Sequence, residues 1–362
     1  SKSGTTTEPA LAFRFLTNPL IIHFGDMDGE THGSARFATD KETAALARAD
    51  SGLLIGRDGK TGKLLRYAGP AHLLTMAPTR TGKGVGTIIP NLLTADRSVI
   101  CIDPKGENAK IAGRARQQFG PVHVLDPFGV TGQPSAAFNP LEGLDPAGLD
   151  VAEDASTLAD ALVFDEPGMA GEAHWNEEAK ALIAGLILHI AASEPRDRRN
   201  LATLREYLTL APETFAALLK DMQASMAASG LIARAANRHL GKSDREAAGV
   251  LSAAQRHTHF LDSPRMTVVL GRSDFRFADL KRRNVSVFLV LPPDRLATYS
   301  RWLRLLVAQL FGARLVQRAA VVQIVPEEQA RRSNRLILRA SDLLLREYRN
   351  GRFAKRAPTL GA

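Results

Sequence analysis

The sequence predicts an α/β protein in which a parallel β-sheet is flanked by helices and interrupted by an all-α insertion. Between residues 73 and 126, short apolar runs alternate with helical stretches at a spacing typical of right-handed βαβ units. From about residue 144 to 261, strand signals disappear and apolar residues recur at three- and four-residue steps. The continuous apolar run VSVFLVL at 285–291 then indicates a strand that is buried on both faces.

Length and composition are those of a folded protein of two or three domains. The chain has 362 residues, of which 44% are hydrophobic and 23% charged, which excludes wholesale disorder. A single cysteine, Cys101, excludes an internal disulfide framework and fits a reducing cytosol. The apolar stretch at 181–192 is shorter than the roughly 18–20 residues that cross a bilayer, so the chain alone is expected to be soluble and cytoplasmic.

The net charge of +9 is concentrated at the C-terminal end. Residues 331–362 hold nine Lys or Arg and two Asp or Glu, a net of +7. Such a basic tail is typical of a contact with nucleic acid or an anionic membrane, and equally of a solubilising terminus.

The elements are expected in the following order. Residues 1–70 form a lead-in with two or three short strands and turn signals at Asp58-Gly59 and Thr61-Gly62. Pro90 is expected to disturb the helix predicted at 83–95. We expect strands at 73–77, 98–103, 122–126, 267–270, 285–291 and 321–325. We expect helices at 83–95, 107–119, 152–164, 174–192, 201–209, 212–227, 230–240, 244–261 and 295–318.

The segment at 77–84, APTRTGKG, has the context of a phosphate-binding loop because it follows a predicted strand and opens a predicted helix. Small residues let backbone N–H groups surround a polyphosphate at the helix N-terminus, and Lys83 meets the terminal phosphates. Compared with the pattern G-x-x-x-x-G-K-[ST], Ala77 replaces the first glycine and Gly84 replaces the magnesium-binding hydroxyl residue. The alternative interpretation is a glycine-rich turn with a surface lysine.

Two acidic residues follow the second strand in the sequence Asp-Pro-Lys-Gly-Glu, at Asp103 and Glu107. Parallel strands end at one edge of the sheet, where ligands bind in open α/β folds. A carboxylate there can hold magnesium-bound water or orient an attacking one. The alternative is a turn before a helix whose first residue is acidic.

Several motifs resemble one family, the coupling-protein ATPases of conjugation and type IV secretion (TraG type). The resemblance covers about residues 32–322. The first similar segments are HGSARFA, LLIGR, APTRTGKGVGTIIPNLL and SVICIDPKGENAKIAGR. The later ones are VHVLDPF, FNPL, LSAAQRHTHFLDSPRM and VSVFLVLPPDRLATYSRWLRLLV. In that family a glycine also follows the loop lysine.

The resemblance implies a RecA-like, P-loop motor that binds ATP and Mg²⁺ and assembles as a homo-hexamer on the cytoplasmic face of the bacterial inner membrane. It would deliver single-stranded DNA, or a relaxase–DNA complex (the relaxosome), to the type IV secretion channel components. Lys83, Asp103 and Glu107 would be the catalytic residues. The nucleotide would be bound by Thr79, Arg80, Thr81, Gly82, Lys83, Gly84 and Val85.

The expected domains follow from the same patterns. They are a lead-in at 1–70, a nucleotide-binding domain in two parts at 71–143 and 263–325, an inserted all-α domain at 144–262, and a basic tail at 326–362. The family's membrane helices and the second half of its motor domain are not expected within this sequence. Pro326, before Glu327 and Glu328, stands where the family places a magnesium-coordinating Asp. The alternative function is therefore a truncated, non-hydrolysing, nucleotide-dependent docking module. A small P-loop kinase fits less well, because the inserted block is an Ala/Leu-rich helical bundle.

Two further groups are interpreted as structural. His257 and His259, with Asp262 nearby, lie on a predicted helix, where His-x-His places the two rings on different faces, so no metal site is expected. Arg301 and Arg304 lie one turn apart on the last long helix and are expected on its solvated face, although they could reach DNA or a neighbouring subunit's phosphate.

Overall fold

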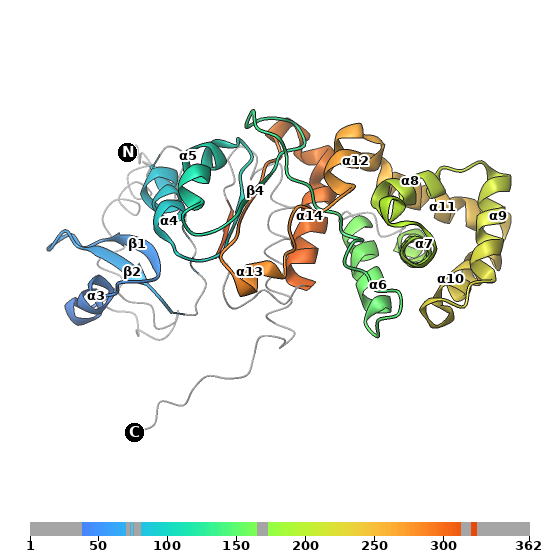
Figure 1. Ribbon diagram of the computed structural model, residues 1–362, viewed down its shortest axis with the longest axis horizontal. Helices are drawn as coiled ribbons and strands as arrows, with labels where there is room; N and C mark the ends of the chain where they lie inside the picture. The colour runs from blue at the N-terminus through green and yellow to red at the C-terminus, as the bar shows by residue number, and fades with distance from the viewer. Residues whose placement is uncertain are drawn as a thin grey trace, which may run out of the picture. The chain divides into compact units, whose positions relative to one another are not determined.

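The computed structural model describes residues 38–69, 73, 75, 81–164, 173–312 and 320–323. The chain divides into two compact units, Ser1–Ala68 and Gly69–Ala362 (Figure 1). Most of the predicted strand at 73–77 (all but residues 73 and 75), four residues of the predicted phosphate loop (77–80, which include Thr79 and Arg80) and the basic tail lie outside the described residues.

In the first unit, a helix and a β-hairpin are described. Helix α3 (Asp40–Ala47) starts at Thr39, whose side chain accepts from the backbone N–H of Glu42 while the Glu42 carboxylate accepts from the backbone N–H of Thr39. Strands β1 (Leu53–Arg57) and β2 (Leu64–Tyr67) pair antiparallel. Both predicted turn signals lie between them.

The second unit contains a parallel sheet whose described strands run in the order β4-β5-β3-β6. The ladder is formed by β3 (Val99–Ile102), β4 (Val122–Leu125), β5 (Ser286–Leu289) and β6 (Ala320–Gln323). Strand β5 is inserted between two strands that precede it by more than 160 residues, and pairs Phe288 with both Cys101 and Val124. The predicted α/β class with a parallel sheet is therefore confirmed.

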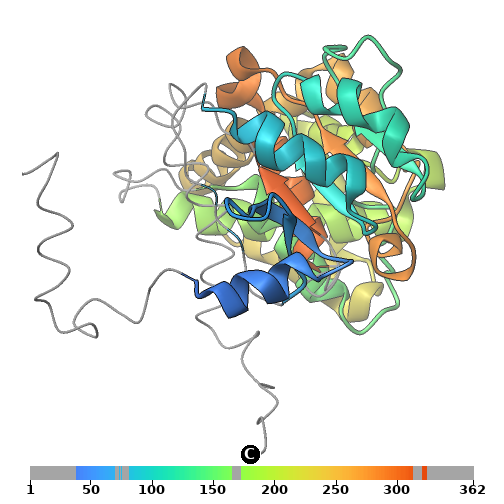
Figure 2. The same ribbon diagram turned by 90° about the vertical axis from the view of Figure 1, so that its left-hand side faces the viewer.

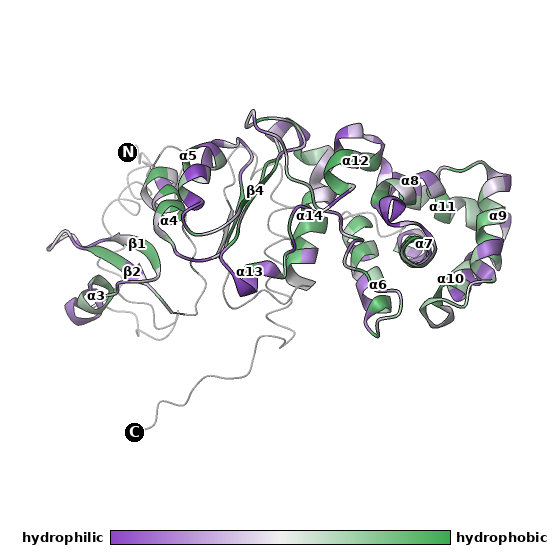
Figure 3. Ribbon diagram, viewed as in Figure 1, coloured by the Kyte–Doolittle hydropathy of each residue, from purple (hydrophilic) through white to green (hydrophobic). Residues whose placement is uncertain are grey.

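Side chains alternate across this sheet, so each strand contributes to two apolar layers. On one face Val99, Cys101 and Phe288 pack with residues of α4 (Ile89–Thr94) and α5 (Glu107–Arg116). On the other face Ile100, Leu125, Val287 and their neighbours join a larger cluster that includes the helices beyond β4. Figure 2 shows α4 and α5 in front of the strands, and Figure 3 shows how apolar residues dominate the strands while the helices mix both kinds.

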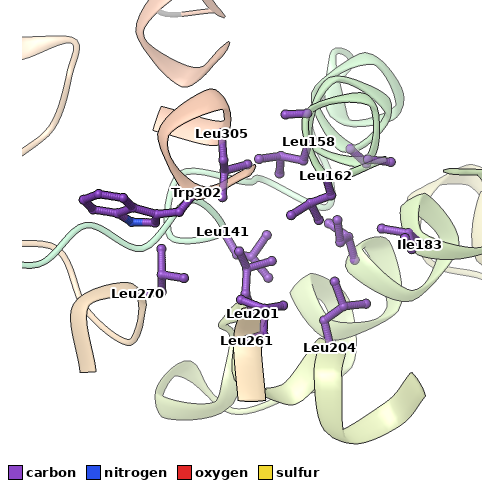
Figure 4. Close-up of a cluster of buried hydrophobic side chains, with 14 of the residues drawn as sticks. Leu141, Leu158, Leu162, Ile183, Leu201, Leu204, Leu261, Leu270, Trp302 and Leu305 are labelled. Atoms are coloured by element: carbon purple, nitrogen blue, oxygen red, sulfur yellow. The ribbon is translucent and has the colours of Figure 1, made fainter. Parts of the chain in front are cut away.

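The helices between β4 and β5 in the chain form one continuous core with the second face of the sheet. Figure 4 shows part of this core, where Leu158, Ile183, Leu204, Leu270 and Trp302 converge from five helices. The helices in this stretch are α6 (Val151–Leu162), α7 (Ala173–Ser193), α8 (Leu201–Leu208), α9 (Pro212–Gln223), α10 (Leu231–Leu240), α11 (Asp244–Thr258), α12 (Pro264–Leu270) and α13 (Asp279–Arg282). Helix α14 (Leu296–Gly312) follows β5.

One predicted strand is wrong. Residues 267–270 belong to helix α12, which has Pro264 in its first turn and starts where the backbone N–H of Met266 donates to the carbonyl of Ser263. The β-branched run Thr267–Val268–Val269 favoured a strand. Proline at the first helical position, which is pre-organised for a helix, prevailed.

The helix after the phosphate loop is also less regular than predicted. Residues Gly84–Ile88 form a π-helix, and α4 begins only at Ile89. Pro90 has no N–H to donate, so the register changes just before it, as expected from the disturbance predicted at this residue. Further along, the predicted helix at 244–261 ends as a 3₁₀ segment, His259–Asp262.

Arg301 and Arg304 are not on a solvated face. Both are half-buried: an Arg301 guanidinium nitrogen lies 3.3 Å from Nδ1 of His257, and the Arg304 guanidinium lies 4.6 Å from the ring centroid of Phe164. His257 itself is buried and lies 2.8 Å from the amide oxygen of Asn176, whereas His259 is exposed. These side chains connect α14 to α7 and α11.

Candidate functional site

The described part of the predicted phosphate loop, Thr81 to Val85, leads directly into helical backbone. Gly82 has a φ of +88°, a conformation that L side chains rarely adopt, and its carbonyl accepts the backbone N–H of Gly86 at 2.7 Å. Lys83 and Gly84 are partly exposed, and Val85 is 71% exposed. The glycine thus allows the chain to turn sharply and start a helix whose first residues face solvent.

Asp103 follows β3 directly and is 2% exposed. One carboxylate oxygen accepts the backbone N–H of Ala109 at 2.9 Å, and the other lies 3.3 Å from the amide nitrogen of Asn108. Asp103 therefore stabilises the first turn of α5. Glu107, the first residue of that helix, is exposed at the same edge of the sheet.

Gly106 makes the connection between these two acidic residues possible. It has a φ of +67°, and its backbone N–H donates to the carbonyl of Asp103 at 3.0 Å. A Cβ at this position would lie 2.9 Å from a methyl group of Thr131. A side chain here would therefore be strained by both the backbone and the neighbouring loop.

Burial raises the pKa of Asp103 above its usual value of 3.8, although its hydrogen bonds oppose the shift. The folded protein then keeps the proton to a higher pH than the unfolded chain does. Stability should therefore fall as the pH rises from below about 4 through the folded pKa. Replacing Asp103 with asparagine should remove this decline when chemical denaturation is measured at a series of pH values.

The same substitution at the exposed Asp197 controls for the loss of one negative charge. Parallel pH profiles of stability for the wild type and Asp103→Asn would contradict the interpretation that burial controls this carboxyl.

A second buried carboxylate at this edge was not selected from the sequence. Asp126 follows β4 and accepts three hydrogen bonds, from the backbone N–H of Val130 at 3.0 Å and from the backbone N–H and hydroxyl of Thr131 at 2.6 and 2.7 Å. It fixes the loop that contacts Gly106. The Asp-Pro step after the strand, which repeats the one at Asp103, was the available signal.

Arg116 was also not identified from the sequence. It lies at the end of α5, is fully buried, and donates to the carbonyls of Leu92, Ala95 and Arg97 at 3.2, 2.5 and 2.6 Å. A fourth bond reaches the hydroxyl of Ser286 on β5 at 2.8 Å. Helix α5 therefore begins at Glu107. At its other end, Arg116 holds the end of α4, the helix that follows the predicted phosphate loop.

The glycine-containing loop thus leads into the helix that precedes β3 in the chain, and acidic residues follow β3 and β4 at the carboxyl edge of the sheet. This is the edge at which open α/β folds bind ligands. Within the described ranges, no group of three His, Cys, Asp or Glu side chains is placed to hold a metal ion. None of the helices in the described part combines the length and the hydrophobicity that crossing a bilayer requires.

Comparison with known proteins agrees with this class of fold. Residues 35–320 match the family model described as type IV secretory system conjugative DNA transfer, and the chain belongs to that family. It is 30% identical over 322 residues to the conjugal transfer protein TraG of Escherichia coli, covering 81% of this chain and 50% of that protein. To protein VirD4 of Rhizobium radiobacter it is 27% identical, covering 82% and 43%.

Solved structures of the plasmid coupling protein TrwB share the fold. The complex of TrwB with the non-hydrolysable ATP analogue ADPNP superposes with a TM-score of 0.57 at 16% identity, covering 79% of this chain and 64% of that one. The complex with ADP and Mg²⁺ gives a TM-score of 0.54 at 17% identity, covering 77% and 60%. The chain spans about half the length of the curated relatives that it matches.

Proposed function

We propose that this chain is an ATP-binding coupling protein of a conjugative DNA transfer or type IV secretion system. It belongs to the conjugative DNA transfer family, and the observation that carries the proposal is the loop from Thr81 to Val85, in which Gly82 turns the chain into a helix start beside Lys83. A helix start with exposed backbone and a lysine suits the phosphates of a nucleotide. TrwB, which shares the fold, has been solved with nucleotide and Mg²⁺.

In this proposal Thr79, Arg80, Thr81, Gly82, Lys83, Gly84 and Val85 hold the nucleotide phosphates. Lys83 neutralises the β- and γ-phosphates, and Mg²⁺ reduces the remaining charge on them. Exposed Glu107 faces solvent at the same sheet edge, whereas Asp103, with both oxygens hydrogen-bonded, acts by positioning the start of α5. Gly84 offers no hydroxyl to the metal.

The remaining assignments rest on the family. The motor would be RecA-like and hexameric, at the cytoplasmic face of the bacterial inner membrane, with single-stranded DNA or a relaxase–DNA complex as cargo and the secretion channel as partner. Its nucleotide-binding domain would comprise residues 71–143 and 263–325, with the inserted all-α domain at 144–262, the lead-in at 1–70 and the basic tail at 326–362. The helices from α6 to α11 (with the 3₁₀ segment that ends at Asp262) support the inserted part, because they fall between β4 and β5 in the chain.

Replacing Lys83 with alanine should weaken the binding of a fluorescent ATP analogue at least tenfold, about 1.4 kcal/mol, because the phosphates lose their principal counter-charge. Fluorescence titration of the full chain measures this. Lys110→Ala, on the exposed face of α5, is the matched control and should bind as the wild type does. Equal affinities for all three proteins would refute nucleotide binding through this loop.

The second candidate is a non-hydrolysing docking module. It is favoured by Pro326, which stands at the position of the family's magnesium-coordinating Asp. The rate of ATP hydrolysis distinguishes the two functions. With saturating single-stranded DNA, a motor should hydrolyse ATP on the order of 1 s⁻¹ or faster. A docking module should not exceed the rate of Lys83→Ala.

A further inference from the structure

Two arginines from separate segments lie over one phenylalanine at the carboxyl edge of the sheet. Phe128 follows β4, Arg265 is the second residue of α12, and Arg295 ends a short 3₁₀ turn after β5. Each guanidinium carbon lies 5.8 Å from the centroid of the Phe128 ring. Since both distances end at the same point, the two guanidinium groups are at most about 11.6 Å apart.

The aromatic part of this cluster is held by the core. Phe128 and Tyr299, from the first turn of α14, meet with ring centroids 5.0 Å apart at 65°, and both pack against the main apolar core. The loop that carries Phe128 is fixed by the three hydrogen bonds to Asp126. One guanidinium N–H of Arg265 donates to the carbonyl of Pro127 at 3.2 Å. The ring that both arginines contact, and the carbonyl that Arg265 contacts, are therefore held in place by the core and by the hydrogen bonds of the loop.

The positive charge of the cluster is only partly compensated. Within the residues that the structure describes, Arg265 forms no ion pair and is exposed. Arg295 contacts its neighbour Asp294 at 3.2 Å, but the two side chains are 54% and 69% exposed. Because water screens such a pair, its interaction free energy is small. Neither arginine is needed to satisfy a buried carboxylate.

We propose that Arg265 and Arg295, supported by Phe128 and Tyr299, form a phosphate-binding site for a single-stranded nucleic acid. An arginine held over an aromatic ring loses little further freedom on binding and presents a planar N–H fork that matches phosphate oxygens. Two such groups within about 11.6 Å can contact nearby phosphates of one strand. The site lies on the edge where the sheet also carries Asp103, so a bound strand would lie near the proposed nucleotide site.

The proposal extends the proposed function, because it names where the cargo strand contacts this chain. The same chemistry would also suit the phosphates of a free nucleotide. A nucleic-acid strand is favoured because the cluster is built from the segment after β4, the start of α12 and the turn after β5 rather than from the loop that contains Lys83, and because the chain belongs to a DNA transfer family. The experiment has to distinguish these two sources of phosphate.

The test compares the full wild-type chain with the double variant Arg265→Gln/Arg295→Gln. Anisotropy of a fluorescent single-stranded oligonucleotide is titrated at several salt concentrations. We expect about tenfold weaker binding in the variant, and a plot of log K against log salt whose slope is smaller by about 1.4, since each phosphate contact on a single strand contributes about 0.7. The double variant Arg234→Gln/Arg245→Gln changes the net charge equally on exposed positions of α10 and α11 and should keep the wild-type slope.

Equal losses in both double variants, or no binding of the oligonucleotide by the wild type, would overturn the proposal. If the glutamine variant does not fold, as judged by circular dichroism, Arg265→Lys/Arg295→Lys keeps the charges but removes the fork. That variant should bind several-fold more weakly with the salt slope retained, and wild-type affinity would count against the site.

A separate titration with the fluorescent ATP analogue distinguishes the two proposals. Arg265→Gln/Arg295→Gln should bind the nucleotide as the wild type does, whereas Lys83→Ala should still bind the oligonucleotide. Loss of nucleotide binding with unchanged oligonucleotide binding in the arginine variant would assign the cluster to the nucleotide and refute the strand site. If Lys83→Ala leaves nucleotide binding intact, the proposed function fails while the strand site stands on its own data.

Discussion

Replacing Arg116 with methionine should lower the free energy of unfolding by about 3–5 kcal/mol, because each buried oxygen that loses its hydrogen bond costs about 1–3 kcal/mol. The guanidinium is fully buried and serves three backbone carbonyls of the α4 end and the Ser286 hydroxyl. It also lies 4.7 Å from the ring centroid of Phe119. Methionine fills similar space but leaves all four oxygens without this donor. Urea denaturation followed by circular dichroism measures the change.

Burial lowers the pKa of the Arg116 guanidinium, with Asp96 opposing the shift, so the charged group has an energetic cost of its own. The hydrogen bonds must exceed this cost for the prediction to hold. Arg114→Met on the exposed side of the same helix is the control and should change stability by no more than about 0.5 kcal/mol. If Arg116→Met lowered the free energy of unfolding no more than Arg114→Met does, the carbonyls would be hydrogen-bonded to water in the variant.

Replacing Gly120 with alanine should lower the free energy of unfolding by about 2–4 kcal/mol, because backbone strain and overpacking each cost about 1–3 kcal/mol. Gly120 precedes β4 and has a φ of +157°, and a Cβ there would lie 1.9 Å from the carbonyl oxygen of Asn284, just before β5. The two strands start side by side here, where the backbone N–H of Ser286 donates to the carbonyl of Pro121 at 2.9 Å. Thermal and urea denaturation both measure the effect.

Two other glycines separate the causes. Gly129 has a φ of +71°, and a Cβ there would have no atom within 4 Å, so Gly129→Ala tests the backbone strain alone. Gly143 has neither a positive φ nor a close neighbour, and Gly143→Ala should be nearly neutral. If Gly120→Ala lowered the free energy of unfolding no more than Gly129→Ala does, the close approach of β4 and β5 would not contribute to the cost of the substitution.

Much of the local structure could be predicted from the sequence. The apolar runs of β3 and β5 and the amphipathic patterns of α6 to α11 act over a few neighbouring residues, and their predicted positions agree with the structure within a few residues at most ends. The error at 267–270 shows the limit of such reasoning. There, β-branched residues favoured a strand by propensity, but a helix start at Ser263 and Pro264 and burial of Val269 and Leu270 in the core favoured a helix.

By itself the sequence determined the α/β class and the resemblance to the family. It also located the glycine-containing segment around Lys83 and the acidic residues after β3. Each of these depends on residues that are close together in the chain. Only the tertiary structure decided that β5 lies between β3 and β4, that Arg116 joins α5 to α4, and that Arg265 and Arg295 meet over Phe128. These partners are separated by between about 20 and 190 residues. Side-chain contacts at such separations follow from how the helices and strands pack in space, which no local pattern of residues specifies.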